Sequence, residues 1–406
     1  MMSKEKRRVP KLRFPGFTED WEQRKLGDFT NQINTFVNPE DAKLPLWSLT
    51  AEAGLIEKSD RYERDFLVKK KDQFKRIETN TLVYNPMNIT IGSIDIYTGL
   101  YPIAVSGYYV SIVYDKNIDT DFLKEALLLP SSLKMYKNYA TGSLIERQRV
   151  QYPTFSKLQL LFPNLDEQKV IGQLFKSLNL NITLHQRKLD NLKLKKKALL
   201  QKLFPKNGER YPELRFPGFT DAWEQRKLSD ILVERNEQQV ETSEYPLMSF
   251  VQGIGVTPKG ERYDRSFLVL DQSKKYKRTE LGDFIYSSNN LETGSIGINK
   301  TGKAVISPVY SIFYGVSIGD SEFIGIMSLL PGFIAKMIRF RQGVVYGQWR
   351  IHEKDFLDIS VAIPSVAERT KITKLILSIE ELITLHQRKL DHLKLQKKAL
   401  LQQMFV

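Results

Sequence analysis

Cationic side chains recur at matched places in the two halves of this 406-residue sequence. Arg and Lys neutralise phosphate groups and release the counterions condensed around them, so they hold a nucleic acid whatever its base sequence. We predict this phosphate-holding role for the shared cations; the alternative is that they only solvate the surface. The matched pairs are Arg61 with Arg262, Arg64 with Arg265, Lys75 with Lys277, Arg76 with Arg278, and Arg149 with Arg350.

Between these cations lie segments that differ between the halves: residues 85–91 (NPMNITI) against 287–293 (SSNNLET), and 143–148 (SLIERQ) against 344–349 (VVYGQW). Side chains at base edges must differ when the target differs, so we predict that these segments read bases. Ordinary loop drift is the alternative. The candidate base readers are Asn85, Asn88, Ser143, Arg147, Gln148, Asn289, Asn290, Tyr346, Gln348 and Trp349.

Motifs that would give the chain a reaction of its own are incomplete. Residues 85–88 (NPMN) lack the second Pro and the aromatic residue of the Asn-Pro-Pro-aromatic motif of adenine methyltransferases, and residues 253–255 (GIG) lack the third Gly of a nucleotide loop. Glu167 lies near Lys169, a combination that could suggest a nuclease, but the copy at residues 368–370 (ERT) lacks the Lys. Both glutamates fall at expected helix starts, where helix capping explains them. With no Cys and four His, we predict no catalytic site, no cofactor and no metal site.

Two sequence blocks occur in both halves and must position these residues. The head motif, residues 10–28 (PKLRFPGFTEDWEQRKLGD), returns as residues 212–230, and the tail block, residues 183–204 (TLHQRKLDNLKLKKKALLQKLF), returns as residues 384–405. Each half therefore contains a head motif, a divergent middle and a tail block, which is the pattern of a duplication. We predict a pseudo-twofold arrangement.

An apolar stripe with heptad spacing runs through each tail block and the residues before it. Capping-box patterns at residues 164–167 and 365–368 mark the expected helix starts. Each stripe needs a partner, so we predict that the two helices pair antiparallel. In the first helix the stripe consists of Ile171, Phe175, Leu178, Ile182, His185, Leu189, Leu192, Lys196, Leu199 and Leu203.

Polar residues interrupt both stripes at equivalent positions. We interpret His185 and His386 as register-setting residues rather than metal ligands. Lys196 and Lys397 are costly to bury unpaired, so each should extend its ammonium to water or face an acidic group on another protein. The lysine-rich run at residues 193–197 reads as the solvated side of the helix, with a phosphate or partner contact as the alternative.

The middle of each half is predicted to be a compact, β-rich, mixed α/β domain. Residues 103–114 and 304–314 have the composition of short strands broken by Gly and Pro. Residues 122–129 and 322–330 are expected to form helices that pack on them.

Composition limits the class of protein. The formal charge of +14 favours a polyanionic partner, with nucleic acid first; a membrane surface and plain solubilising charge are the alternatives, which composition alone does not separate. No stretch is apolar for the roughly 18 residues that span a bilayer. The lack of Cys and of an apolar leader favours the cytoplasm.

The order RFPGFT-x-x-WEQRKL, divergent domain and LHQRKLD-x-LK helix, given twice, resembles type I restriction-modification specificity (S) subunits, in wording those of low-GC Gram-positive bacteria. The resemblance covers essentially the whole chain. It implies an α+β fold in which two mixed α/β target-recognition domains are separated by two long antiparallel coiled-coil helices. Each domain would read one half of a bipartite site in double-stranded DNA. The helices would set the spacing and dock two methyltransferase (M) subunits that carry S-adenosylmethionine and methylate adenine, and restriction (R) subunits would join for cleavage.

Mapped onto this chain, the resemblance predicts four parts: residues 1–165 with the first recognition domain, 166–204 as the first spacer helix, 205–365 with the linker, head motif and second domain, and 366–406 as the second spacer helix. The second tail block ends where the lead-in of the first head motif would follow, which predicts a circular arrangement with adjacent termini. Two other functions stay open: a stand-alone repeat DNA-binding regulator and a protein-interaction scaffold.

Overall fold

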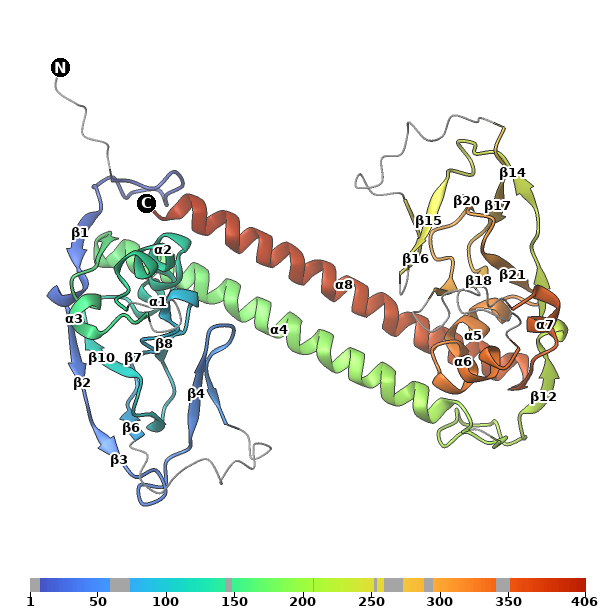
Figure 1. The fold of residues 1–406 in the computed structure, drawn as a ribbon, viewed down its shortest axis with the longest axis horizontal. Coiled ribbons are helices and arrows are strands. Elements are labelled where there is room, and N and C mark those ends of the chain that lie inside the picture. Colours follow the sequence, from blue (N-terminus) through green and yellow to red (C-terminus); the bar gives the residue numbers. More distant parts are fainter. Residues whose placement is uncertain are drawn as a thin grey trace. The chain divides into compact units, whose positions relative to one another are not determined.

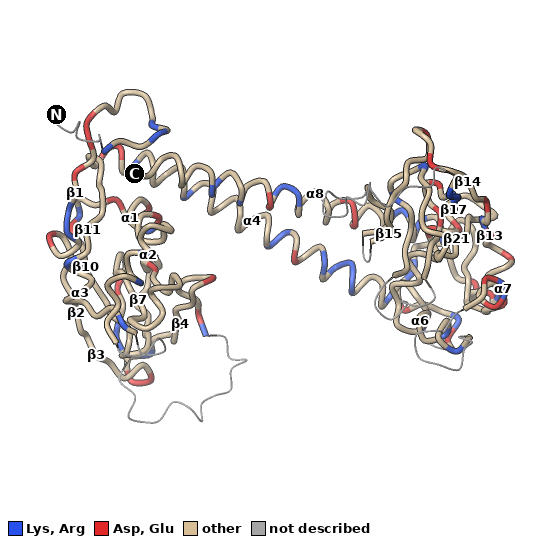
Figure 2. Tube along the Cα trace, turned by 45° about the horizontal axis from the view of Figure 1, so that its top comes forward, with Lys and Arg blue, Asp and Glu red and all other residues tan. Residues whose placement is uncertain are grey.

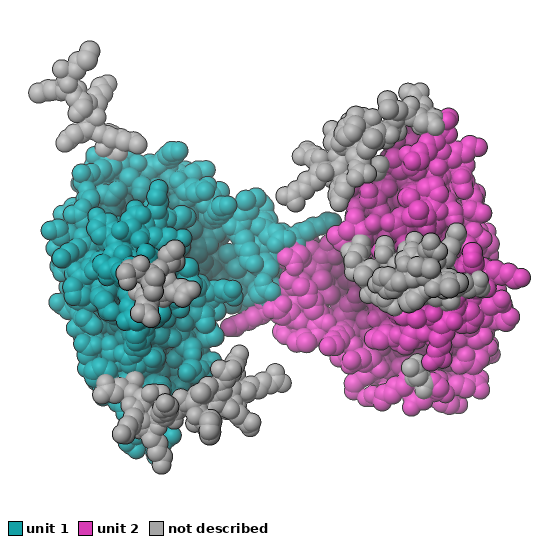
Figure 3. Space-filling model, in the orientation of Figure 1, with its two compact units in different colours: residues 1–186, 388–406 teal, residues 187–387 magenta. Residues whose placement is uncertain are grey.

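The chain divides into two compact units, which the computed structural model describes over residues 8–58, 74–142, 148–206, 208–251, 254–258, 273–287, 295–340 and 351–406. One unit comprises residues 1–186 with 388–406, and the other comprises residues 187–387 (Figure 3). Each unit therefore contains a complete middle domain, the start of one long helix and the end of the other (Figure 1).

The two long helices have the same length. Helix α4 spans Leu165–Leu203 and α8 spans Val366–Met404, 39 residues each. Their predicted seam is confirmed, because every position of the α4 stripe is buried or half-buried. The side chains of Asn164 and Ser365 accept the backbone N–H groups of Glu167 and Glu368 at 2.9 and 3.3 Å, which satisfies one free donor at each helix start.

Within each unit the start of one long helix packs against the end of the other. In the first unit the rings of Phe175 and Phe405 lie 5.8 Å apart, and both belong to one core cluster. In the second unit Leu200 and Leu203 share a cluster with Ile372. The pairing is antiparallel inside both units, as predicted.

The middle domain of the first unit is a mixed α/β structure. Sheet order β2-β10-β7-β8 forms a four-stranded antiparallel sheet, β3-β6-β9 a three-stranded one, and β4-β5 and β1-β11 are pairs. The expected strands at residues 103–114 and the helix near 122–129 are confirmed. The elements are β1 (Glu22–Lys25), β2 (Thr30–Ile33), β3 (Phe36–Val37), β4 (Trp47–Thr50), β5 (Gly54–Glu57), β6 (Phe74–Ile77), β7 (Thr81–Tyr84), η2 (Ile89–Ile91), β8 (Ile94–Tyr97), β9 (Ile103–Ser106), β10 (Val110–Tyr114), α1 (Thr120–Leu128), α2 (Pro130–Tyr139), α3 (Tyr152–Phe155) and β11 (Gln159–Phe162).

The second unit repeats this order, with sheets β13-β21-β18-β19 and β14-β17-β20 and pairs β15-β16 and β12-β22. The shared topology supports the duplication read from the head and tail blocks. Its elements are β12 (Glu224–Lys227), β13 (Leu232–Glu234), β14 (Gln238–Gln239), β15 (Met248–Val251), β16 (Gly255–Pro258), β17 (Tyr276–Thr279), β18 (Phe284–Tyr286), β19 (Ile296–Ile298), β20 (Ala304–Ile306), β21 (Ser311–Gly315), α5 (Asp320–Met327), α6 (Pro331–Ile338), α7 (Glu353–Leu357) and β22 (Ser360–Ile363).

Each domain has two cores, one on either face of its four-stranded sheet. Successive strand residues point to opposite faces, so Leu82 and Tyr84 join the large core under the helices while Val83 joins a smaller core with Leu49 and Val105. Both faces of the sheet are thereby covered.

Within the described ranges no single helix has the length and apolar composition to cross a membrane, although α5 and α6 meet that measure as a pair bent by 93°.

Candidate functional site

The head motif and the tail block meet in the core of each unit. In the first unit Trp21 and Phe405 lie 6.0 Å apart, ring centroid to ring centroid, and both pack on Phe122 of α1. Trp223 and Phe204 lie 5.9 Å apart in the second unit, where Phe323 takes the place of Phe122. The repeated blocks are therefore one structural joint that holds each middle domain on the helices.

An arginine of the head motif binds the glutamate at the start of each long helix. The Arg13 guanidinium donates to both carboxylate oxygens of Glu167 at 2.7 Å, and Arg215 donates to Glu368 at 2.8 and 2.7 Å. Both carboxylates are buried, at 0% and 1% exposure. The interpretation that capping alone explains these glutamates was incomplete, because their backbone is capped while their side chains anchor the head motif. The recurrence of both partners in the two halves was the available signal.

The beginning of the described chain lies against the end of the last helix. The backbone N–H of Leu12 donates to the carbonyl of Gln403 at 2.9 Å. At the equivalent place in the second unit, Leu214 donates to Lys202 at 2.8 Å, but there a continuous chain joins the two segments. In the first unit the head motif and the helix end are thus held together by a non-covalent contact. In the second unit a covalent linker also joins them.

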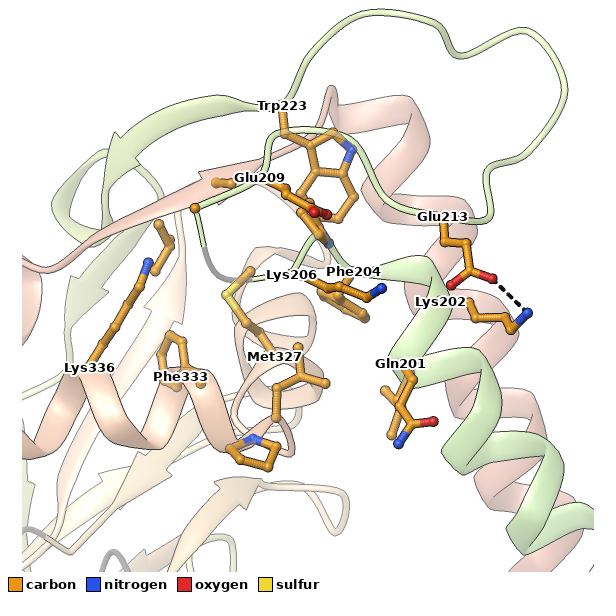
Figure 4. A pocket seen from close by; sticks show the side chains of 18 of the residues that line it. Gln201, Lys202, Phe204, Lys206, Glu209, Glu213, Trp223, Met327, Phe333 and Lys336 are labelled. Carbon is orange, nitrogen blue, oxygen red and sulfur yellow. Dashed lines mark hydrogen bonds and ion pairs between the residues drawn. The ribbon is translucent and has the colours of Figure 1, made fainter.

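The covalent junction borders a hollow of about 650 Å³ (Figure 4). Phe204, Met327 and Phe333 form its apolar wall, and Lys202 and Glu213 pair at its rim at 2.7 Å. Each of these side chains belongs to the second unit.

In the first unit the residues that follow segment 143–148 lie against segment 85–91. The N–H of Val150 donates to the carbonyl of Pro86 at 3.0 Å, which places the end of segment 143–148 against the start of segment 85–91. Asn85 is half-buried and accepts the N–H of Met87 through its side chain at 3.0 Å, whereas Asn88 is exposed. Gln148 is half-buried. The structure therefore brings the described flank of segment 143–148 against segment 85–91, although the two are far apart in the sequence.

In the second unit, hydrogen bonds also connect the residues that flank the divergent segments. Ser287 and Ser295 share a backbone hydrogen bond of 2.8 Å across one segment, as Asn85 and Ser93 do at 3.0 Å. Ile351, which follows the other segment, accepts the Tyr286 hydroxyl at 3.4 Å. The described flanks of both segments therefore meet at the same edge of the sheet in both units.

Lys75 and Lys277 are buried, at 4% and 5% exposure. The Lys75 ammonium donates to the carbonyl of Tyr109 at 2.7 Å and lies 5.5 Å from the centre of the Phe36 ring, and burial lowers its pKa. Lys277 lies 3.8 Å from the carboxylate of Glu353. A phosphate contact by either lysine would require its side chain to leave these partners.

Arg76 and Arg278 are accessible but occupied by carboxylates. Arg76 pairs with Glu78 at 2.6 Å. Arg278 pairs with Glu237 at 2.8 Å and also with Glu280, so much of its charge is compensated within the domain. A phosphate at these places would compete with the carboxylates.

Arg149, in the described flank of segment 143–148, combines charge with an aromatic neighbour. Its guanidinium carbon lies 5.7 Å from the centre of the Tyr108 ring, and Tyr108 is itself exposed. Arg149 is half-buried, and a partly accessible cation beside an exposed aromatic ring is typical of a surface that binds nucleic acid. The remaining predicted residues lie outside the described residues: Arg61, Arg64, Ser143, Arg147, Arg262, Arg265, Asn289, Asn290, Tyr346, Gln348, Trp349 and Arg350.

The seam lysines meet acidic groups of this same chain. Lys397 lies 2.9 Å from a carboxylate oxygen of Glu125 on α1, and Lys196 lies 2.6 Å from Glu380 on α8. The expected acid on another protein was wrong, because both acids belong to this chain. The lysine side chains also keep 21% and 23% of their surface exposed. Other lysines are spread along both helices (Figure 2), and Lys193 is exposed, as expected for a solvated side.

Comparison with known proteins defines the class of fold. No protein-family model matches the sequence, and no curated protein matches it. Among solved structures, the crystal structure of a type I restriction-modification system S subunit from M. genitalium matches 98% of this chain and 99% of its own, with 12% identity and a TM-score of 0.65. The chain therefore has the fold of a type I specificity subunit.

Two further structures match along the chain with lower superposition. The HsdS subunit from Thermoanaerobacter tengcongensis covers 97% of both chains at 15% identity, with a TM-score of 0.39. A structure from work on complex assembly and conformational transition of the type I R-M system covers 98% of this chain and 99% of its own. It has 14% identity and a TM-score of 0.40.

Proposed function

We propose that this protein is the DNA-specificity subunit of a type I restriction-modification system, in which each middle domain reads one half of a bipartite target in double-stranded DNA. The observation that carries the proposal is the fold shared with an S subunit over nearly the whole of both chains. The duplication supports it, because the two copies share their topology and differ in the segments expected to read bases.

In this proposal residues 1–165 and 205–365 carry the recognition domains, and residues 166–204 and 366–406 are the spacer helices. Shared cations position each domain on the phosphates, and the divergent segments at the sheet edge contact base edges. Among the residues that the structure describes, we favour the half-buried Arg149 as a phosphate contact, and we assign its counterpart Arg350 the same role.

We assign no reaction to the chain itself. Methyl transfer to adenine would belong to two M subunits carrying S-adenosylmethionine, and cleavage to R subunits. Such a complex acts on cellular DNA, so we propose a cytoplasmic location.

Exposed leucines on both helices support docking of a partner protein. Leu184 and Leu194 on α4 are 49% and 65% exposed, and their repeat equivalents Leu385 and Leu395 on α8 are 61% and 66% exposed. The same apolar residues recur at equivalent exposed positions of both tail blocks, which suits two copies of one partner. A stand-alone regulator has no need of this surface, so we propose it as the place where M subunits dock.

The test is to co-express the chain with the M subunit of its source strain in a host without such a system, and to map methylated adenines by single-molecule sequencing. We expect one bipartite motif, and affinity of the complex for that DNA should fall steeply with salt. A discrete footprint by the chain alone that ignores the M subunit would instead favour the regulator. Affinity that hardly changes with salt would favour the scaffold.

Replacing residues 143–148 by a different hexapeptide tests the assignment of the base readers. The methylated motif should change in one half only, because the segment belongs to one domain. An unchanged motif would remove this segment from the interface. As a matched control, replacing residues 344–349 should change only the other half.

A further inference from the structure

In the first unit a single buried carboxylate joins the recognition domain to both long helices. Glu125 of α1 is 4% exposed. It accepts a hydrogen bond from the Asn179 amide of α4 at 2.7 Å and lies 2.9 Å from the Lys397 ammonium of α8. A buried charge is tolerated only when it is paired and hydrogen-bonded, so this contact ties three elements together.

The second unit has an equivalent joint with the carboxylate in another place. Glu380 of α8 pairs with Lys196 of α4 at 2.6 Å and also with Lys300, in the turn between β19 and β20 of the recognition domain. Again one carboxylate connects both helices and the domain. Burial raises the pKa of Glu380, but the hydrogen bonds and charges of Lys196 and Lys300 outweigh it and hold the pKa below its ordinary value.

Alignment of the two halves shows that the acid changes position while the lysine does not. Lys397 corresponds to Lys196, both within the tail block. Asn179 corresponds to Glu380 on the helix, and Glu125 of the domain corresponds to a buried isoleucine, Ile326. Each unit therefore supplies one carboxylate to the constant lysine from one of two positions.

We infer that each recognition domain and the first half of the long helix that follows it form one matched cassette, and that the carboxylate facing the tail-block lysine is what matches them. In each half, the two positions that can hold the acid lie in one continuous stretch: 125 and 179 before residue 186, and 326 and 380 before residue 387. The compact units divide at the same places. Lys196 and Lys397 follow these division points.

Separating a domain from its helix half breaks the match in a predictable way. The first domain on the helix of the second unit places Glu125 beside Glu380, two carboxylates at one lysine. The reverse combination places Ile326 beside Asn179 and leaves the half-buried lysine without an anion, which is unfavourable. Exchange of half-site specificity, which rests on the proposed function, would therefore require the whole cassette.

A four-variant cycle in the full chain tests the match. Glu125→Ile alone and Asn179→Glu alone should each lower the midpoint of urea unfolding, the first by removing the anion and the second by adding a like charge. The double variant copies the arrangement of the second unit and should recover most of the loss. Losses that add in the double variant would overturn the inference. The reciprocal cycle, Ile326→Glu with Glu380→Asn, provides the same readout if a variant of the first cycle does not fold.

Two chimeras separate this inference from the proposed function. In one, residues 12–186 replace residues 214–387; in the other, the junction lies at the helix start, and residues 12–163 replace residues 214–364. The first should unfold at a higher urea concentration than the second, and Glu380→Asn should restore the second. Equal stability and no effect of Glu380→Asn would contradict the cassette. A stable first chimera that does not direct methylation to a repeated half-site would instead contradict the proposed function.

Discussion

At the scale of single residues, buried ion pairs connect parts of the chain that are remote in sequence. Arg13 and Glu167 are far apart in the sequence, yet their side chains meet in a bidentate contact that excludes water from the carboxylate. Such a pair gains little over an apolar contact of the same shape, but removing one partner leaves a buried charge. The head motif is thereby anchored at the start of α4, and its copy is anchored at the start of α8 through Arg215 and Glu368.

We expect Arg13→Ala to lower the free energy of unfolding by about 3–5 kcal/mol, because it leaves the Glu167 carboxylate buried without its partner. Urea denaturation followed by circular dichroism measures the change. The double variant Arg13→Ala with Glu167→Ala should be less damaging than the single one. Lys11→Ala, at an exposed neighbouring position, is the control, and equal effects of Arg13→Ala and Lys11→Ala would contradict the assignment.

Glu380 should make the stability of the protein depend on pH in acid. Its pKa in the folded chain lies below the ordinary value of 4.5, so the unfolded chain takes up its proton at a higher pH than the folded chain does. The stabilisation is therefore present above that value and is lost as pH falls through the folded pKa. Urea titrations of the native protein and Glu380→Gln, run from neutral pH down to pH about 3, should converge as the pH falls. A difference that stays constant over this range would rule out the contribution.

At the scale of elements, the long helices have two kinds of surface. The seam packs inside each unit, and a second set of apolar residues remains exposed at equivalent repeat positions. Exposed apolar patches on soluble proteins are commonly sites of protein association. The helices thus serve both as supports for the domains and as the proposed docking surface.

We expect the double variant Leu194→Glu with Leu395→Glu to lose M-subunit binding while its unfolding midpoint stays unchanged, because both side chains are largely exposed. Size-exclusion chromatography of the mixed proteins measures the binding. Asn191→Glu, exposed on the same helix, adds charge without removing an apolar group and should bind normally. Normal assembly of the leucine variant would place the docking surface elsewhere.

At the scale of the whole molecule, the described start of the chain completes the unit that holds the end of α8. Leu12 and Gln403 form the same backbone hydrogen bond as Leu214 and Lys202. A continuous linker joins only the second pair. This contact brings residue 12 to the end of α8, and residues 1–7 lie outside the described residues. Cutting one junction and closing the other should therefore leave the interactions within each unit unchanged.

A circular permutant tests this equivalence. It joins Val406 to Arg8 through a copy of residues 206–209, which lie between the equivalent Pro205 and Arg210, and opens the chain at Gly208, an exposed position. We expect the native unfolding midpoint and, with the M subunit, the same methylated motif. A permutant that fails to fold, beside a version that carries the added linker without the cut, would show that the two junctions are not equivalent.

Local pattern determined much of this protein. The heptad stripe, the helix starts, the strand-rich middles and the duplication were readable from residue type and spacing, because each depends on neighbours within a few turns or on direct repetition. Only the tertiary structure decided the partners of Arg13, Lys196 and Lys397. It also decided the contact between Pro86 and Val150, which follows segment 143–148. A buried charge takes whichever opposite charge packing brings within reach, and Glu125 and Glu380 show that this position can change between two copies while the lysine stays the same.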